Sequence, residues 1–227
     1  MPEQGILRRV AVTRGRFEGR GLVEGLWIVG WASLALVAMT ISVFAAAGTG
    51  EDGVRMLIRA TARSSLALFS LAFAASSLRR LVHVPATAWL LRNRRYLGLS
   101  FAVSHALHLA GIVALAEGWP ESFARTSTTT LIGGGLGYGF VAAMAATSND
   151  RAVAWLGRRR WRLLHLTGSW LLWGIFASSY VPRAVRAPGY LPLAVLPVAV
   201  LGVRVAAWLR QGSAMRRRSP ASSSVGQ

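Results

Sequence analysis

The 227-residue chain has 53% hydrophobic and only 15% charged residues, and its mean hydropathy is +0.44. A soluble domain usually carries about a quarter charged residues, so this composition favours a membrane protein. The formal net charge of +18 rests on arginine, because no lysine is present. The arginines form short clusters between apolar runs instead of one basic face, which argues against a nucleic-acid partner. Without cysteine, disulfides, thiolate catalysis, cysteine-ligated zinc and iron–sulfur clusters are excluded.

Six segments approach the about 20 apolar residues that a helix needs to cross the hydrocarbon core. They span residues 22–48, 54–78, 96–118, 129–147, 161–180 and 191–209. The first could be mistaken for a cleaved signal peptide, but its apolar run is too long, so we expect a retained helix. The second is the least regular, because Arg55, Arg59 and Arg63 lie in its first half. The sequence therefore predicts an all-α membrane protein, a six-helix transmembrane bundle.

The arginines between these segments predict the orientation of the bundle. Most of them lie in the N-terminal segment, in the second-to-third and fourth-to-fifth connections and after the last span. Basic residues of short loops are retained on the cytoplasmic side, so we expect both termini there, in a multi-pass protein of the plasma (inner) membrane in contact with lipid. We divide the chain into a cytoplasmic segment (1–21), a membrane domain (22–209) and a disordered, basic and serine-rich cytoplasmic tail (210–227).

Three histidines fall within the predicted spans or at their mouths, where an ionisable residue indicates function by default. His105 and His108 are three residues apart on the third span and share one face, while His165 lies near the start of the fifth. Imidazoles from two neighbouring helices can ligate a haem iron from its two sides. Glycines at 133–139 would let a flat macrocycle approach the fourth span closely, although this feature alone favours ordinary packing of small residues between helices. His83 lies in the basic connection beside Pro85, and we interpret it as a loop residue.

Several short motifs follow one another along the predicted bundle. RRYLGL at residues 94–99 leads to His108, TSND stands at 147–150, LG at 156–157, and WRLLH at 161–165 ends on His165. In this order and spacing the chain, from about residue 55 to 180, resembles the ferric-reductase-like transmembrane domain family, which includes the NADPH oxidases and MsrQ. The resemblance implies a membrane domain that binds haem b and carries electrons.

By position, the resemblance implies that His108 and His165 are the two axial ligands of one haem b. Family members with two haems place further histidines where this chain has Ser122 and Ser178, so one haem is expected and the two-haem relay across the membrane is absent. At 1.5 Å per residue, the depths of His108 and His165 differ by roughly 13 Å. His105 would reduce this difference by about 4.5 Å, so it stays as the alternative ligand.

Two arginines of the second span are further candidates for the haem site. Arg59 and Arg63 are four residues apart and share a face, so they could neutralise the two propionates. Snorkelling of both side chains to the membrane surface is the alternative.

The leading functional hypothesis is a membrane-bound b-type cytochrome that passes single electrons between a donor and an acceptor. No Gly-x-Gly-x-x-Gly fingerprint follows a predicted strand, so a quinol, a bound flavin mononucleotide (FMN) or a separate reductase subunit would supply the electrons. The alternative is a non-redox structural or interaction protein that keeps a degenerate form of the same bundle, which the two serines favour. A transporter is a weaker third hypothesis, since no internal repeat is evident.

Overall fold

The computed structural model describes residues 22–218, and every regular element in this range is helical, which confirms the predicted all-α class. The elements are α2 (Leu26–Ala47), α3 (Glu51–Leu81), α4 (Pro85–Arg92), α5 (Arg94–Gly118), α6 (Pro120–Ala124), α7 (Thr128–Ala146), α8 (Asp150–Leu156), α9 (Arg158–Arg186), the 3₁₀ turn η1 (Pro188–Tyr190) and α10 (Leu191–Arg218). The predicted segment 1–21 and tail residues 219–227 lie outside the described residues. The tail was expected from residue 210, but α10 continues to Arg218.

Five helices in the described part of the chain are long and apolar enough to cross a membrane, which makes the chain a multi-pass membrane protein. They are α2, α3, α5, α7 and the segment Pro188–Ser213, which comprises η1 and most of α10. The fifth predicted span forms α9, a helix of 29 residues that is long enough for a crossing. Polar residues such as His165, Thr167 and Ser169 lower its hydropathy, so it is not among the five.

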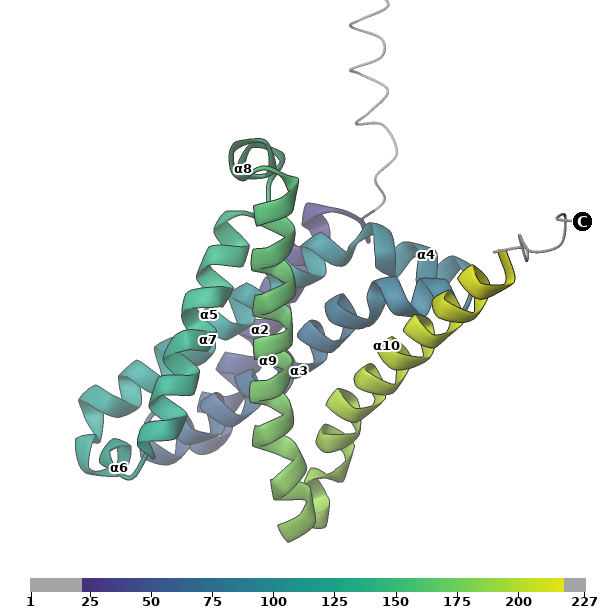
Figure 1. Ribbon diagram of the computed structural model, residues 1–227. Coiled ribbons are helices and arrows are strands. Elements are labelled where there is room, and N and C mark those ends of the chain that lie inside the picture. The colour runs from purple at the N-terminus through teal and green to yellow at the C-terminus, as the bar shows by residue number, and fades with distance from the viewer. Residues whose placement is uncertain (1–21, 219–227) are drawn as a thin grey trace, which may run out of the picture.

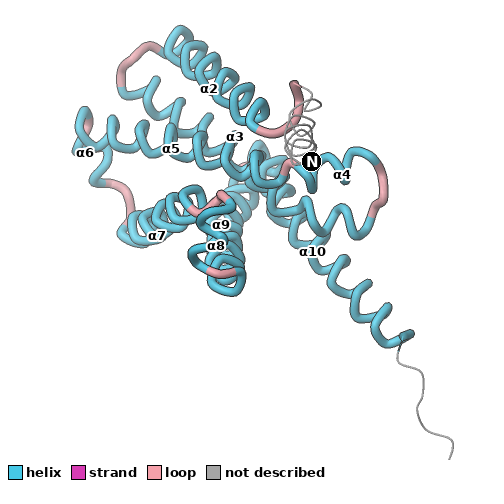
Figure 2. Tube along the Cα trace, turned by 90° about the horizontal axis from the view of Figure 1, so that it is seen from above, coloured by secondary structure: helices cyan, strands magenta, loops and turns pink. Residues whose placement is uncertain are grey.

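The centre of the bundle is the pair α3 and α5, which lies between α2 on one side and α7 and α9 on the other (Figure 2). Small hydroxyl residues let the two helices approach closely and hydrogen-bond across the contact. Ser104 Oγ lies 2.9 Å from Oγ of both Ser64 and Ser65, and it also donates to the carbonyl of Thr61. Thr61, Ser65 and Ser104 are completely buried. The seam is therefore polar but satisfied, as a membrane interior requires.

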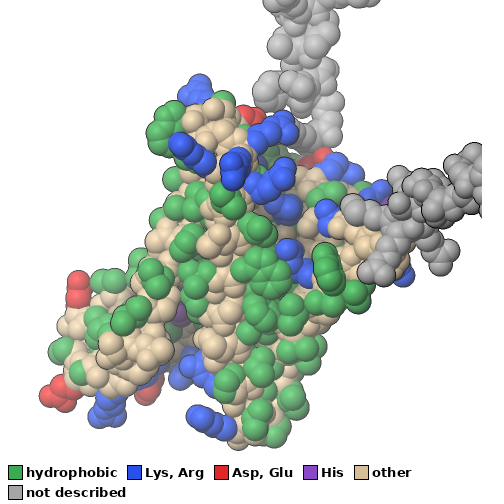
Figure 3. Space-filling model, viewed as in Figure 1, with side chains coloured by type: hydrophobic (Ala, Val, Ile, Leu, Met, Phe, Trp, Pro, Cys, Tyr) green, Lys and Arg blue, Asp and Glu red, His purple; other side chains and the backbone are tan. Residues whose placement is uncertain are grey.

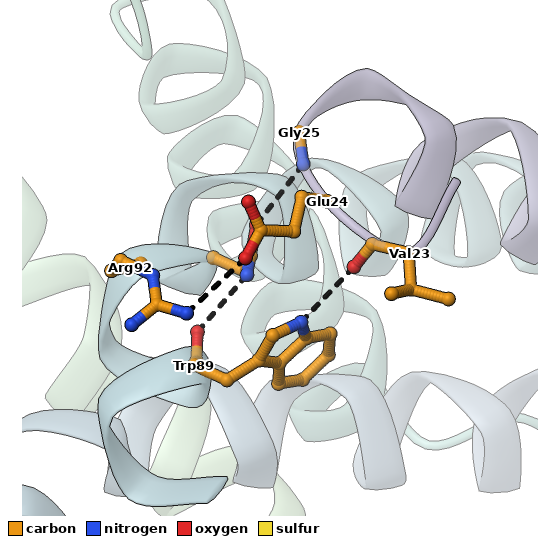
Figure 4. Close-up of polar contacts among 6 residues, drawn as sticks. Val23, Glu24, Gly25, Trp89 and Arg92 are labelled. Carbon is orange, nitrogen blue, oxygen red and sulfur yellow. Dashed lines mark hydrogen bonds and ion pairs between the residues drawn. The ribbon is translucent and has the colours of Figure 1, made fainter. Parts of the chain in front are cut away.

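Three polar contacts join the start of α2 to α4 and to Asn93, the residue between α4 and α5 (Figure 4). Gly25 N donates to Asn93 Oδ1 (3.0 Å), and the Asn93 amide donates to the carbonyl of Trp89 (3.0 Å). The Trp89 indole donates to the carbonyl of Val23, and Arg92 pairs with Glu24 at 3.2 Å. At the other end of α2, Gly53 of α3 meets the carbonyl of Gly48 so closely that no Cβ would fit.

The helices α7 and α9 pack through single glycines. A Cβ on Gly137 would lie 3.0 Å from Ile175, and one on Gly168 would lie 2.8 Å from Met144 Sδ and 2.9 Å from Phe140. Gly139, by contrast, faces open space, as do Gly133, Gly134 and Gly135. Most glycines of residues 133–139 therefore lie away from the other helices. Small-residue helix packing accounts for Gly137.

The apolar core joins α3, α5, α7, α9 and α10, and Leu66, Phe69, Phe101, Leu172 and Phe176 are among its buried residues. The helices α9 and α10 meet at η1 and then diverge (Figure 1). Arginine side chains gather at the end of the molecule where α3 ends, α5 begins and α8 lies (top of Figure 3), which we call the basic end. The opposite end holds α6 and η1.

Candidate functional site

A cavity of about 840 Å³ opens at the basic end between α3, α5, α7, α8, α9 and α10. Its inner walls are apolar and partly aromatic, formed among others by Phe69, Phe73, Phe101, Val141 and Met144. Its lining also includes six arginines and one carboxylate. The arginines are Arg80, Arg94, Arg95, Arg158, Arg162 and Arg204. The cavity thus combines apolar walls with a strongly cationic rim, a combination suited to an amphiphilic anion.

His165 of α9 lines this cavity and is held in one orientation by α7. Its Nε2 lies 3.2 Å from Thr147 Oγ1, which donates its own proton to the carbonyl of Ala143 (2.7 Å). The threonine oxygen is therefore the acceptor, and Nε2 carries the proton while Nδ1 keeps its lone pair. The Trp161 ring packs on the imidazole with ring centroids 4.3 Å apart, and the Trp161 indole donates to the carbonyl of Thr147. The imidazole is preorganised, with one nitrogen able to ligate.

Arg204 of α10 lines the cavity from the opposite side to α7, and it is only partly solvated. Its Nη1 donates to the carbonyl of Phe73 (3.0 Å), and its guanidinium carbon lies 4.0 Å from the Phe73 ring centroid and 5.0 Å from that of Trp170. Its Nε is buried and has no hydrogen-bond partner. The sequence reasoning gave this residue no role, although a lone arginine within an apolar span is the same kind of signal that selected the histidines.

His105 and His108 lie away from this cavity, in a packed cluster at the middle of the bundle. His108 Nδ1 lies 3.0 Å from Thr61 Oγ1, whose proton goes to the carbonyl of Leu57 (2.7 Å), so Nδ1 donates and Nε2 keeps its lone pair. The His105 ring stacks on that of His108, with ring centroids 5.5 Å apart, and packs in a tilted arrangement against Tyr138, with centroids 4.6 Å apart. The buried atoms His105 Nδ1 and Tyr138 Oη have no hydrogen-bond partner.

The structure does not bring either of these histidines level with His165. Along α7, His165 lies beside Thr147 and His105 beside Tyr138, nine residues earlier, which corresponds to about 13 Å of helix rise. Along α9, the neighbour of His105 is Phe176, with ring centroids 6.3 Å apart, eleven residues or about 16 Å beyond His165. His108 lies about one further turn away. Ligation of one iron by His108 and His165 would require the helices to slide past each other by more than two turns.

The remaining sequence-predicted positions also lie outside the cavity. Arg59 and Arg63 are exposed on the half of α3 nearer α6, so the arginines that face the cavity are a different set. Ser122 lies beyond α5, on α6, where its hydroxyl donates to Glu51 (2.6 Å). Ser178 donates to the carbonyl of Ile175 within α9. Across residues 22–218, no three His, Asp or Glu side chains gather into a group that could hold a metal ion.

Comparison of the chain with protein-family models, with curated proteins and with solved structures finds no match. The site must therefore be interpreted from its own chemistry. What that chemistry offers is one oriented imidazole with a free nitrogen, aromatic walls that exclude water, and a rim of guanidinium groups that attracts negative charge.

Proposed function

We propose that this chain is a membrane-bound b-type cytochrome that holds one haem b in the cavity beside His165 and passes single electrons from a donor to an acceptor. The observation that carries the proposal is the cavity itself, where an oriented imidazole, aromatic walls and a cationic rim converge. Its volume of about 840 Å³ falls within the about 300–1,000 Å³ that is usual for cofactor sites. The resemblance to the ferric-reductase-like family supports the same assignment.

The residues present fit haem b in three respects. His165 would supply a nitrogen ligand to the iron, and Thr147 and Trp161 fix the orientation of its ring. Phe69 and Phe101 line the cavity and would exclude water from a bound cofactor, which would lower the local dielectric and tune the reduction potential. Arg94 and Arg162 lie at the mouth, where guanidinium groups would pair with the two propionates. When bound, the haem supplies a one-electron redox centre.

The histidines that face the cavity differ from the pattern of the ferric-reductase-like family, in which two histidines ligate one haem. Among the histidines of the described residues, His165 alone lines the cavity, whereas His105 and His108 lie about 13 Å or more further along the bundle. We therefore assign the haem to His165 as its single histidine ligand. Ligation of one haem by both His108 and His165, which the family resemblance implies, stays a prediction. The absorption spectrum of the His108→Ala variant tests it.

We further propose a bundle of six transmembrane helices in the plasma membrane, with α9 as the fifth crossing and both termini cytoplasmic. The arginines at the basic end support this orientation. Because the chain has no cysteine, single cysteines report the topology directly. A cysteine at Ser148 should react with an impermeant maleimide from the cytoplasmic side, and one at Gly189 from the other side. Labelling of both from one side would contradict the crossing by α9.

The electrons would come from a quinol, from bound FMN or from a separate reductase subunit. The cavity opens at the basic end, so a donor in the cytoplasm or in the adjoining half of the membrane has access to it. The acceptor is proposed only as a redox partner, because no residue of the site selects one.

The test is an absorption spectrum of the purified protein, oxidised and then reduced with dithionite. We expect the Soret band of bound haem to disappear in His165→Ala and to persist in His108→Ala and His105→Ala. Haem content near one per chain is expected. Loss of the band in both His165→Ala and His108→Ala would restore the paired-ligand assignment, and a folded but colourless protein would overturn the cytochrome proposal.

A second candidate is a non-redox interaction protein built on the same bundle. It is favoured by the placement of His105 and His108, which are packed against Thr61 and Tyr138, whereas no second histidine of the described residues faces the cavity. Under this alternative the histidines stabilise helix contacts, and the purified protein is colourless even after expression with excess haem.

A further inference from the structure

The guanidinium of Arg204 presents one edge without a partner at the α3–α10 side of the cavity. Nη1 donates a hydrogen bond to the carbonyl of Phe73, and Nε is buried without a hydrogen-bond partner. No hydrogen bond joins Nη2 to any described residue. Leaving a buried donor without a partner is unfavourable, and more so when the group is charged, so a partner is expected. Nε and an adjacent amino nitrogen form a fork that two oxygens of one oxyanion fit.

The described residues offer this arginine no carboxylate. The ion pairs among them are Glu51–Arg55, Glu24–Arg92 and Asp150–Arg95. None involves Arg204, and the only carboxylate that lines the cavity, Asp150, is already paired. The nearby arginines add to the positive charge. The missing partner is therefore an anion from outside this part of the chain.

The depth of Arg204 indicates what kind of anion can reach it. Arg210, at the basic end of the same helix, donates to the carbonyl of Leu81, where α3 ends. Arg204 lies six residues earlier, about 9 Å deeper in the bundle. The helices α9 and α10 diverge towards the basic end (Figure 1), and arginines are visible between them in Figure 3. Arg204 is among the residues that line the cavity. Phe73 and Trp170 supply apolar surface beside the charge.

We propose that Arg204, assisted by Arg80, binds a phosphate group between α10 and α3, with an anionic phospholipid of the adjoining leaflet as the ligand that best fits this depth. A phosphate neutralises the arginine within the apolar bundle, which removes the cost of an unpaired charge there. The acyl chains of the lipid then lie along the apolar surface of α9 and α10. Soluble phosphate esters share the recognition chemistry, so the test separates the two sources. The phosphate site lies in the same cavity as the proposed haem, which we place towards His165, Arg94 and Arg162.

The experiment is native mass spectrometry of the delipidated, full-length protein titrated with phosphatidylglycerol, phosphatidylcholine or glycerol phosphate. We expect phosphatidylglycerol to bind best. Arg204→Gln should weaken it about ten- to a hundredfold, the effect of losing charge-assisted hydrogen bonds. Arg204→Lys, which keeps the charge but loses the fork, should be intermediate. The matched control Arg210→Gln, on the same helix, should change the affinity less than about threefold.

Four other results would contradict or change the proposed lipid site. Equal affinity of Arg204→Gln and the unaltered protein overturns the proposal, and so does equal loss in Arg204→Gln and Arg210→Gln, which indicates general charge attraction. Glycerol phosphate binding as tightly as the lipid retains the phosphate site but removes the lipid as its ligand. Loss of haem together with lipid in Arg204→Gln assigns the arginine to the haem site instead. Retention time in gel filtration identifies a variant that fails to fold, and Arg80→Gln then replaces it.

Discussion

The two histidine-bearing regions of this bundle differ in how they are built. Around His165 the helices enclose a cavity whose walls are apolar and whose mouth is cationic. Around His105 and His108 the helices close on one another, and side-chain hydroxyls take up the hydrogen bonds. The same residue type therefore serves two purposes. An imidazole beside a cavity can bind a ligand, whereas one in a packed seam contributes to helix association.

The largest difference should appear in chemical accessibility. In the cysteine-free background, Ser148→Cys at the cavity should be labelled fully by a water-soluble maleimide in detergent, and Ser104→Cys in the completely buried seam should stay unlabelled. Mass spectrometry of the intact protein measures both. Comparable labelling of the two would show that the middle of the bundle is open as well.

Truncation of an apolar side chain should cost far more in the packed centre than at the cavity. Leu66 is completely buried, so Leu66→Ala should destabilise the protein by about 2–5 kcal/mol. Leu166 lines the cavity and is 46% exposed, so Leu166→Ala should have a small effect. Unfolding in mixed micelles, followed by circular dichroism, compares the two variants. A larger loss at Leu166 would contradict the distinction.

Added bulk should be harmful only where α7 and α9 touch. Gly168→Val places atoms against Met144 and Phe140, and overpacking of this kind costs about 1–3 kcal/mol. Gly139→Val extends into open space and should leave the stability nearly unchanged. The same unfolding measurement tests the pair. Equal destabilisation by the two would mean that a second surface covers Gly139.

The smallest effect should come from the polar seam itself. Thr61→Val removes the hydrogen bond to His108, and interhelical hydrogen bonds in membranes contribute on average about 0.6 kcal/mol. A double-mutant cycle with His108→Ala should give a coupling energy of this order. A coupling of zero would show that the two side chains do not interact, and a loss of haem would return His108 to the haem site.

Much of the fold could be predicted from apolarity and arginine placement. The predicted third span, 96–118, corresponds to α5 (Arg94–Gly118), and the predicted fourth, 129–147, to α7 (Thr128–Ala146). The short helices α4, α6 and α8 were missed, because a search for long apolar runs overlooks them. Their starts were nevertheless marked by Pro85, Pro120 and the Asn149 side chain that caps α8.

The candidate site was harder to predict because it depends on how far one helix is shifted along the next. Sequence spacing placed His165 near a helix start and gave a depth difference of roughly 13 Å to His108, and the structure keeps both α5 histidines apart from His165 by at least that amount. A single sequence carries no information about contacts between α5, α7 and α9. For the same reason the sequence suggested Arg59 and Arg63 as partners of the haem propionates, whereas the arginines that line the cavity include Arg94 and Arg162.

The fastening of α2 has a consequence for the order of assembly. The backbone amide of Gly25 donates a hydrogen bond to the side chain of Asn93. Asn93 is synthesised 68 residues later, after α2 and α3. Until then the start of α2 has no protein partner for this amide, so water at the membrane surface must satisfy it. We expect α2 to enter the membrane early and to dock later, when Trp89 and Asn93 arrive. Asn93→Ala should therefore slow the docking of α2 while leaving its insertion unaffected.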